Sequence, residues 1–171
     1  MYSLVVMKKK VFGEKGFTLV EMIAVLILVG IIAAFAGLGV VRVIEGLLFA
    51  KMNAETTQKA QAAMTRLVKE FTVISSVDPG ATTATAMTFT SYKQGLAGVH
   101  VVTWVGTNLL LDGNILTDQV SAFALGYYDS YGGIKQSTWS SSRRVIEISL
   151  GLKGASSTVS VFTDRVVPRN L

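Results

Sequence analysis

Residues 17–41 read FTLVEMIAVLILVGIIAAFAGLGVV, an apolar stretch whose only polar side chains belong to Thr18 and Glu21. A bilayer hydrocarbon core of about 30 Å is crossed by roughly 20 helical residues. The stretch is long enough to span that core, and it contains no proline that would interrupt a helix. We therefore predict a transmembrane helix over residues 17–41.

Basic charge is concentrated ahead of this stretch. Lys8, Lys9, Lys10 and Lys15 against the single Glu14 account for +3 of the formal net charge of +5. Basic residues that flank a membrane span remain in the cytoplasm, so we expect a cytoplasmic N-terminus and place the rest of the chain on the other side. Because the isoelectric point of about 9.6 largely reflects this N-terminus, it is a weak argument for nucleic-acid binding.

Composition limits the chemistry that the chain can perform. It has 171 residues, half of them hydrophobic, which suits one folded domain and excludes a disordered chain. The lack of cysteine excludes a disulfide scaffold, cysteine-ligated zinc and thiol catalysis. A single histidine, His100, excludes a two-histidine metal site, and no serine has a visible base beside it. The sequence therefore predicts neither catalytic residues nor metal ligands of these kinds.

The junction ahead of the apolar stretch, Lys15-Gly16-Phe17-Thr18-Leu19-Val20-Glu21, reverses the order of an ordinary secretory signal. Such a signal places its small-residue cleavage site after the apolar core, whereas here the glycine comes before it. A basic leader, a glycine, Phe-Thr-Leu and a lone glutamate ahead of an unbroken apolar helix resemble the N-terminal motif of the type IV pilin and type II secretion pseudopilin family.

The resemblance implies how the N-terminus is processed and used. A membrane prepilin peptidase would cut between Gly16 and Phe17, remove the leader (residues 1–16) and N-methylate Phe17. Glu21 would neutralise the amine of a neighbouring subunit and set its register as a filament grows. A carboxylate in apolar surroundings is costly unless it is paired, which agrees with that role.

The same resemblance implies location and partners. The chain would span the bacterial inner membrane once, with a cytoplasmic N-terminus and a periplasmic C-terminal domain, and would then enter a pilus or pseudopilus. Its partners would be the peptidase and N-methyltransferase, other pilin or pseudopilin subunits, the inner-membrane assembly platform and membrane lipid. The alternative is a plain signal anchor, in which Glu21 lies about 6 Å inside the apolar stretch and reaches the interface.

Small residues form one face of the predicted membrane helix. Gly30, Ala33, Ala34 and Gly37 recur every three or four positions, so another helix could approach closely there. Many family members have a proline midway along this helix, where the chain partly unwinds in the filament. Here Gly37 and Gly39 occupy that neighbourhood.

After Arg42 the apolar run becomes amphipathic. Apolar residues recur close to i, i+3, i+4 and i+7 spacing at Met64, Leu67, Val68, Phe71 and Ile74. One helix from residue 17 to about residue 75 would be about 90 Å long, more than a domain of this size could bury. Residues 17–41 are therefore expected in a bilayer or a filament core, and residues 42–77 against the chain's own domain. Asp78-Pro79-Gly80 is expected to end the helix.

Beyond Gly80 the apolar period changes to two, and Thr, Val, Ser and aromatic residues dominate. The expected strands are Met87–Tyr92, Val99–Val105, Asn108–Leu111, Ile115–Leu116, Val120–Tyr128, Arg144–Leu152 and Thr158–Val166, with a turn at Asp112-Gly113-Asn114. The predicted fold class is α+β and pilin-like: a long N-terminal helix packed on an antiparallel β-sheet, with residues 78–171 as the globular domain.

The C-terminal sequence narrows the resemblance. Residues 145–150 (VIEISL) and 161–171 (VFTDRVVPRNL), together with residues 64–70 (MTRLVKE), are similar to J-type minor pseudopilins and W-type minor pilins. This similarity implies a minor filament subunit.

Two ligand hypotheses concern the C-terminal domain. Asp112, Asn114 and Asp118 offer oxygen ligands of the kind that calcium uses, but the EF-hand spacing is missing and Asp-Gly-Asn is a common turn. Arg143 and Arg144 could contact DNA phosphates, which would make the chain a DNA-binding or adhesive minor pilin, or could belong to a solvated strand edge. We expect no other cofactor.

Overall fold

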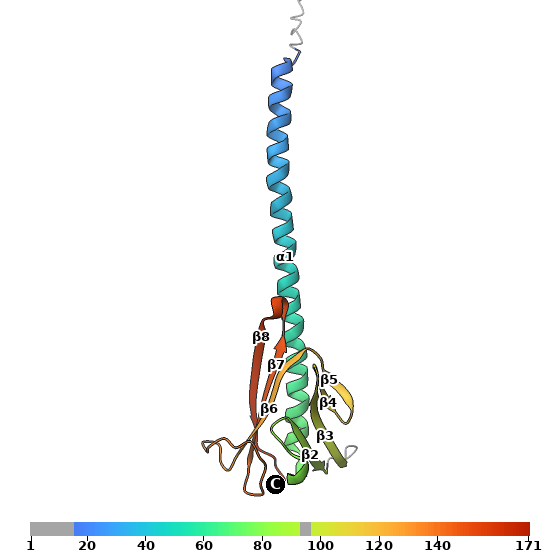
Figure 1. The fold of residues 1–171 in the computed structure, drawn as a ribbon, viewed down its shortest axis with the longest axis vertical. Coiled ribbons are helices and arrows are strands. Elements are labelled where there is room, and N and C mark those ends of the chain that lie inside the picture. Colours follow the sequence, from blue (N-terminus) through green and yellow to red (C-terminus); the bar gives the residue numbers. More distant parts are fainter. Residues whose placement is uncertain (1–15, 93–96) are drawn as a thin grey trace, which may run out of the picture. The chain divides into compact units, whose positions relative to one another are not determined.

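A computed structural model describes residues 16–92 and 97–171 (Figure 1). The chain divides into two compact units, Met1–Glu45 and Gly46–Leu171. Helix α1 (Leu19–Thr72) begins in the first unit and ends in the second. Every described residue of the first unit is exposed. The leader, apart from Gly16, lies outside the described residues.

The second unit contains two antiparallel sheets, not the single sheet that we predicted. The first sheet has five strands in chain order, namely β1 (Ile74–Val77), β2 (Ala86–Ser91), β3 (Gly98–Val105), β4 (Asn108–Leu111) and β5 (Asn114–Thr117). The second sheet has three strands, β6 (Val120–Tyr128), β7 (Val145–Lys153) and β8 (Val159–Val166). Short 3-10 turns η1 (Pro79–Ala81) and η2 (Ala155–Ser157) lie between β1 and β2 and between β7 and β8.

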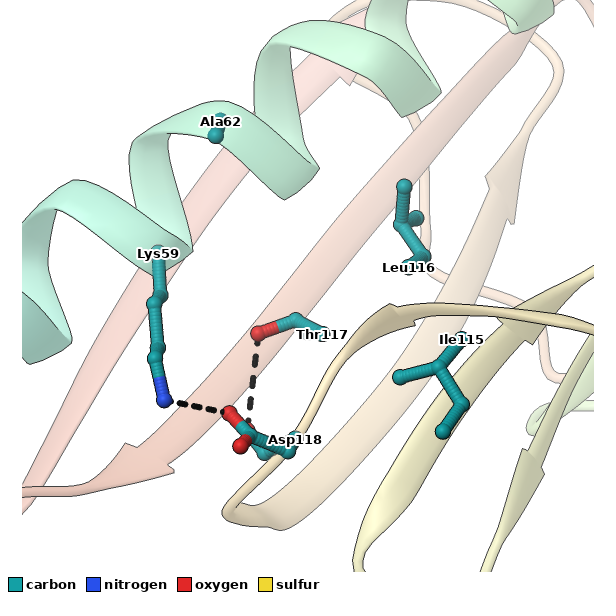
Figure 2. A pocket seen from close by; sticks show the side chains of 6 residues that line it. All are labelled: Lys59, Ala62, Ile115, Leu116, Thr117 and Asp118. Atoms are coloured by element: carbon teal, nitrogen blue, oxygen red, sulfur yellow. Dashed lines mark hydrogen bonds and ion pairs between the residues drawn. The ribbon is translucent and has the colours of Figure 1, made fainter.

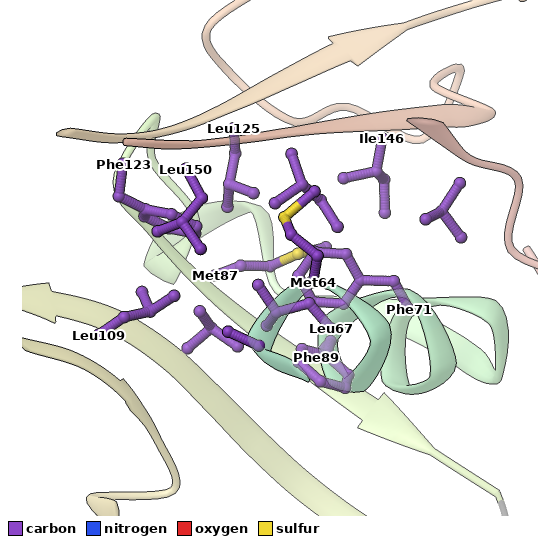
Figure 3. Close-up of a cluster of buried hydrophobic side chains, with 14 of the residues drawn as sticks. Met64, Leu67, Phe71, Met87, Phe89, Leu109, Phe123, Leu125, Ile146 and Leu150 are labelled. Atoms are coloured by element: carbon purple, nitrogen blue, oxygen red, sulfur yellow. The ribbon is translucent and has the colours of Figure 1, made fainter. Parts of the chain in front are cut away.

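One hydrophobic core joins the helix to both sheets. Figure 3 shows side chains of α1 (Met64, Leu67, Phe71), of the five-stranded sheet (Met87, Phe89, Leu109) and of the three-stranded sheet (Phe123, Leu125, Ile146, Leu150) gathered in one cluster. Phe71 packs edge-on against Phe89, with ring centroids 5.5 Å apart. The buried helix positions follow the predicted amphipathic spacing. Because this helix packs on antiparallel sheets, the predicted α+β fold class is confirmed.

The end of the helix was predicted too late. α1 ends at Thr72, and residues 74–77, which we assigned to the helix, form β1 beside β2. Thr72, Val73 and Ile74 are β-branched and therefore weak helix formers. Ile74 is fully buried, so its predicted place in the core is confirmed, whereas its predicted helical conformation is wrong. Pairing with β2 decided the outcome, because it satisfies backbone groups that a frayed last turn would leave open.

The other strands agree closely with the prediction. Asn108–Leu111 and Val120–Tyr128 are exact, and the remaining five differ by one residue at one or both ends. The predicted turn is confirmed at Asp112 and Gly113, with φ of +54° and +77° as a two-residue hairpin requires, whereas Asn114, which we placed in the turn, begins β5.

The β7–β8 loop is fastened to the helix at Asn53. Asn53 Oδ1 accepts a hydrogen bond of 3.0 Å from the backbone N–H of Ala155. A Cβ atom at Gly154 would lie 2.6 Å from that same oxygen. A side chain at position 154 would therefore crowd Asn53 and disturb this hydrogen bond.

Candidate functional site

The residues of the predicted processing site lie at the start of α1. Gly16 and Phe17 precede the helix and are exposed. The carbonyl of Thr18 accepts the first helical hydrogen bond, from Met22 N at 3.2 Å, which makes Thr18 the N-cap. A peptidase acting between Gly16 and Phe17 would therefore meet non-helical, accessible backbone.

Thr18 has a role that our sequence analysis missed. Its Oγ1 accepts a hydrogen bond of 3.2 Å from the backbone N–H of Glu21. Thr-x-x-Glu at a helix start is the pattern of a capping box, in which the glutamate carboxylate reaches back toward the N-cap N–H. The pattern was available in the sequence and locates the helix start to the residue. Glu21 itself is exposed.

The predicted packing residues lie on a bare helix. Gly30, Ala33, Ala34 and Gly37 are all exposed on α1, at a spacing that places them on one face. A Cβ atom added at Gly30 or Gly37 would have no atom within 4 Å. Glycine inside a helix costs roughly 1 kcal/mol relative to alanine. Contacts within the described chain give no reason for that cost, so a reason must come from another molecule or from backbone flexibility.

Large apolar side chains surround the same part of the helix. From Leu19 to Met52 the exposed set includes Leu26, Ile32, Phe35, Leu38 and Leu47, each more than half exposed. An 18-residue window of α1 has a mean hydropathy of 2.8, and none of its residues is buried. The helix is therefore long and apolar enough to cross a membrane. Such a surface requires lipid or partner helices.

Comparison with known proteins identifies the motif. Residues 12–37 match the family model of the prokaryotic N-terminal methylation motif, which is typical of type IV pilins and pseudopilins. No curated protein and no solved structure matches the chain significantly. The chain thus carries a pilin-type methylation motif that includes the first part of a helix long enough to span a membrane, followed by a pilin-like α+β fold. Proteins with this motif are structural subunits, not enzymes, and the chain fits an inner-membrane anchor that crosses the membrane once.

The two arginines predicted to contact DNA differ in their surroundings. Arg143 Nη1 lies 2.5 Å from Asp129 Oδ1, and the Arg143 side chain is only 16% exposed. Hydrogen bonds from Ser142 and Arg143 hold the pKa of Asp129 below its ordinary value. Arg144 is exposed, and among the described residues it has no ion pair. Contact with nucleic acid stays a prediction, and Arg144 is better placed for it than Arg143.

The residues of the calcium hypothesis are engaged by other groups. Asp118 Oδ1 lies 2.7 Å from Lys59 Nζ, beside a shallow groove of about 340 Å³ between α1 and β5 (Figure 2). Asp112 bonds His100 Nδ1 at 2.7 Å and the Val101 N–H at 2.8 Å. Burial raises the pKa of Asp112, but its hydrogen bonds with His100 and Val101 outweigh this and lower it. Among the described residues, no three His, Cys, Asp or Glu side chains could hold a metal ion together. Calcium binding stays an untested hypothesis.

Sequence analysis also missed a charged cluster on the three-stranded sheet. Glu147 of β7 lies between Gly126 of β6 and Arg165 of β8. Its Oε2 accepts hydrogen bonds from Arg165 Nε and the Tyr128 hydroxyl, each at 2.8 Å, and its Oε1 accepts one from Lys135 Nζ at 2.6 Å. A Cβ atom at position 126 would lie 2.5 Å from Lys135 Cε, so glycine there opens the path for the lysine.

This cluster fastens the β6–β7 loop. Burial raises the pKa of Glu147, but the hydrogen bonds from Lys135, Tyr128 and Arg165 prevail and lower it to about 2. Arg165 Nη1 also donates to the Tyr131 carbonyl at 3.1 Å. No local signal predicts the cluster, because its members lie as far as 37 residues apart in the chain.

Proposed function

We propose that the chain is a minor structural subunit of a type IV pilus or type II secretion pseudopilus. The observation that carries the proposal is the helical surface from Leu19 to Val41, which is apolar, is uncovered by the described chain and lies largely within the matched motif of residues 12–37. In this proposal the N-terminus lies in the cytoplasm, the second unit lies in the periplasm, and assembly buries the helix among the helices of other subunits.

The driving force for assembly is helix packing and charge pairing. Lipid tails are as apolar as leucine, so transfer from membrane to filament core gains little from the hydrophobic effect. Gly30, Ala33, Ala34 and Gly37 support close helix contact, since nothing within the described chain occupies the space beside the two glycines. Pairing of Glu21 with the new amine of Phe17 on a neighbouring subunit would remove two uncompensated charges from apolar surroundings.

Processing is tested by intact-mass measurement and N-terminal sequencing of membrane-extracted chain, produced with and without a prepilin peptidase. We expect a chain that begins at N-methylated Phe17 only when the peptidase is present. A chain that retains its leader in both cases would overturn the proposal and favour a signal anchor.

Incorporation is tested with Glu21→Ala. We expect normal cleavage and at least a tenfold loss of this subunit from sheared filaments, measured by quantitative immunoblotting. Glu45→Ala is the matched control, because Glu45 is also an exposed carboxylate on α1 but lies beyond the apolar stretch. Equal incorporation of Glu21→Ala and wild type would remove the register role of Glu21.

The minor status rests on the C-terminal sequence similarity and is tested by counting. Quantitative mass spectrometry of purified filaments should find this chain at a small fraction of the abundance of the main subunit. A one-to-one or larger share would make it a major subunit instead.

A further inference from the structure

A second candidate site lies within the second unit. Three segments distant in sequence enclose a hollow of about 300 Å³: the β1 strand with Ser75 and Ser76, the β6–β7 loop, and the residues after β8 with Asn170. Two guanidinium groups, Arg143 and Arg144, line it. The described residues contribute no carboxylate side chain to its lining. The lining thus combines two guanidinium groups with hydroxyl and amide groups, and it also includes Val77, Trp139 and Leu171.

The loop that supplies the arginines is held in place. The backbone N–H of Arg144 donates to the Tyr128 carbonyl at 2.8 Å, and that of Arg143 donates to the Ser140 carbonyl at 3.0 Å. Trp139, which also lines the hollow, packs edge-on against Tyr127 with ring centroids 5.5 Å apart. The lining is therefore organised before any ligand arrives, which lowers the ordering cost of binding.

We propose that this hollow binds a phosphate group. Asp129 occupies one nitrogen of Arg143, whereas the exposed fork of Arg144 is available to an oxyanion. Ser76, Ser141 and Asn170 add hydroxyl and amide donors around the hollow. A phosphate dianion has more acceptor oxygens than a carboxylate and carries a larger charge, so it can use more of these donors at once. This site is independent of the filament proposal, because it uses none of the residues of α1.

The chain supplies its own reporter for the test. It has two tryptophans, Trp104 and Trp139, and Trp139 lines the hollow. Trp104→Phe leaves Trp139 as the only tryptophan, which is excited selectively at wavelengths where tyrosine does not absorb. The buried Trp104 Nε1 has no hydrogen-bond partner among the described residues, so this substitution removes a polar group without leaving a new one unsatisfied. Circular dichroism melting confirms that each variant is folded.

The experiment titrates the full chain carrying Trp104→Phe, in detergent micelles at constant ionic strength, with inorganic phosphate, with thymidine monophosphate and with acetate. We expect saturable changes in Trp139 fluorescence with phosphate and at least tenfold weaker binding of acetate. If both phosphate compounds bind, the site accepts a phosphate on a larger molecule; if inorganic phosphate alone binds, the site is specific for the free ion.

Variants distinguish binding at this site from non-specific electrostatic attraction between phosphate and the basic protein. Arg144→Ala should weaken phosphate binding by about tenfold or more, because it removes one group that donates charge-assisted hydrogen bonds. Lys153→Ala removes the same charge from an exposed residue of the second unit outside this lining and should leave binding unchanged. Arg144→Lys should fall between wild type and Arg144→Ala. No saturable response, equal affinity for acetate, or equal weakening by Arg144→Ala and Lys153→Ala would overturn the proposal.

Discussion

The two units of the chain share one helix but treat apolar residues in opposite ways. In the first unit, the Leu38 side chain is 65% exposed, and every described residue is exposed to solvent. In the second unit, Leu67 on the same helix is 0% exposed and lies in a core made with both sheets. The second unit completes its own core, whereas the first requires lipid or other subunits. Helix formation is therefore common to both units, but only one of them encodes its own packing partners.

Truncating a leucine in each unit tests this contrast and should give the largest effect. Leu67→Ala should lower the free energy of unfolding of the second unit by about 3–5 kcal/mol, because it leaves a cavity in the core. Leu38→Ala should leave that free energy unchanged. Both are measured by urea unfolding in detergent, followed by tryptophan fluorescence. Equal losses would mean that the exposed helix contributes to the stability of the second unit.

Glu147 provides a second test, within the self-sufficient unit. Its pKa of about 2 lies below the value near 4.3 of an unfolded chain, so its stabilising effect is complete above about pH 4.5 and is lost as the pH falls toward 2. Glu147→Gln should cost about 3 kcal/mol at pH 7 and flatten the decline in stability between pH 5 and 2.

The control for Glu147 is Glu55→Gln, since Glu55 carries an exposed carboxylate that pairs only loosely, at 3.9 Å, with Lys51. When the free energy of unfolding is measured at a series of pH values, Glu55→Gln should show the same acid transition as the wild type. If Glu147→Gln follows the wild-type pH profile, the carboxylate does not hold the loop as the geometry indicates.

Two glycines sharpen the comparison further. Gly154→Ala should cost about 2 kcal/mol, since the new Cβ would displace Asn53 from the β7–β8 loop. Gly37→Ala has open space within the described chain and should strengthen the helix by up to about 1 kcal/mol while reducing incorporation into filaments. Urea unfolding and filament immunoblotting report the two effects. Full incorporation of Gly37→Ala would show that no neighbour approaches closely at that position.

The smallest effect concerns the start of the helix. Thr18→Ala should lose the N-cap and destabilise the first turn of α1 by about 1 kcal/mol, without changing the unfolding of the second unit. Thr18→Ser retains the hydroxyl and serves as control. Amide hydrogen exchange at residues 19–22 should accelerate in the alanine variant alone. Unchanged exchange would mean that Thr18 does not cap the helix in the membrane-bound chain.

Local patterns were sufficient for most of the fold. The helix, seven of the strands and the Asp112-Gly113 turn follow from periodicity and turn residues that lie close together in the chain. β1 was missed because Ile74 satisfies the helical apolar spacing equally well. Its assignment depends on β2, from which it is separated by the η1 turn.

The candidate sites also differ in how far the sequence predicts them. The processing motif occupies consecutive residues, so Gly16, Phe17 and Glu21 could be named from the sequence; they lie within the motif match over residues 12–37, and their individual roles stay predictions. Glu147 was passed over because its partners come from a loop and two other strands. Arg143 and Arg144 were noticed as a pair, but only the structure distinguishes the engaged arginine from the exposed one.

By itself, the sequence determined the apolar helix, its motif and the alternating strands, because each depends on side chains within a few residues of one another. The tertiary structure decided where the helix stops, how the strands divide between two sheets, and which charges meet around Glu147 and in the arginine-lined hollow. These features depend on strand register and loop closure, which bring together residues that no spacing along the chain relates.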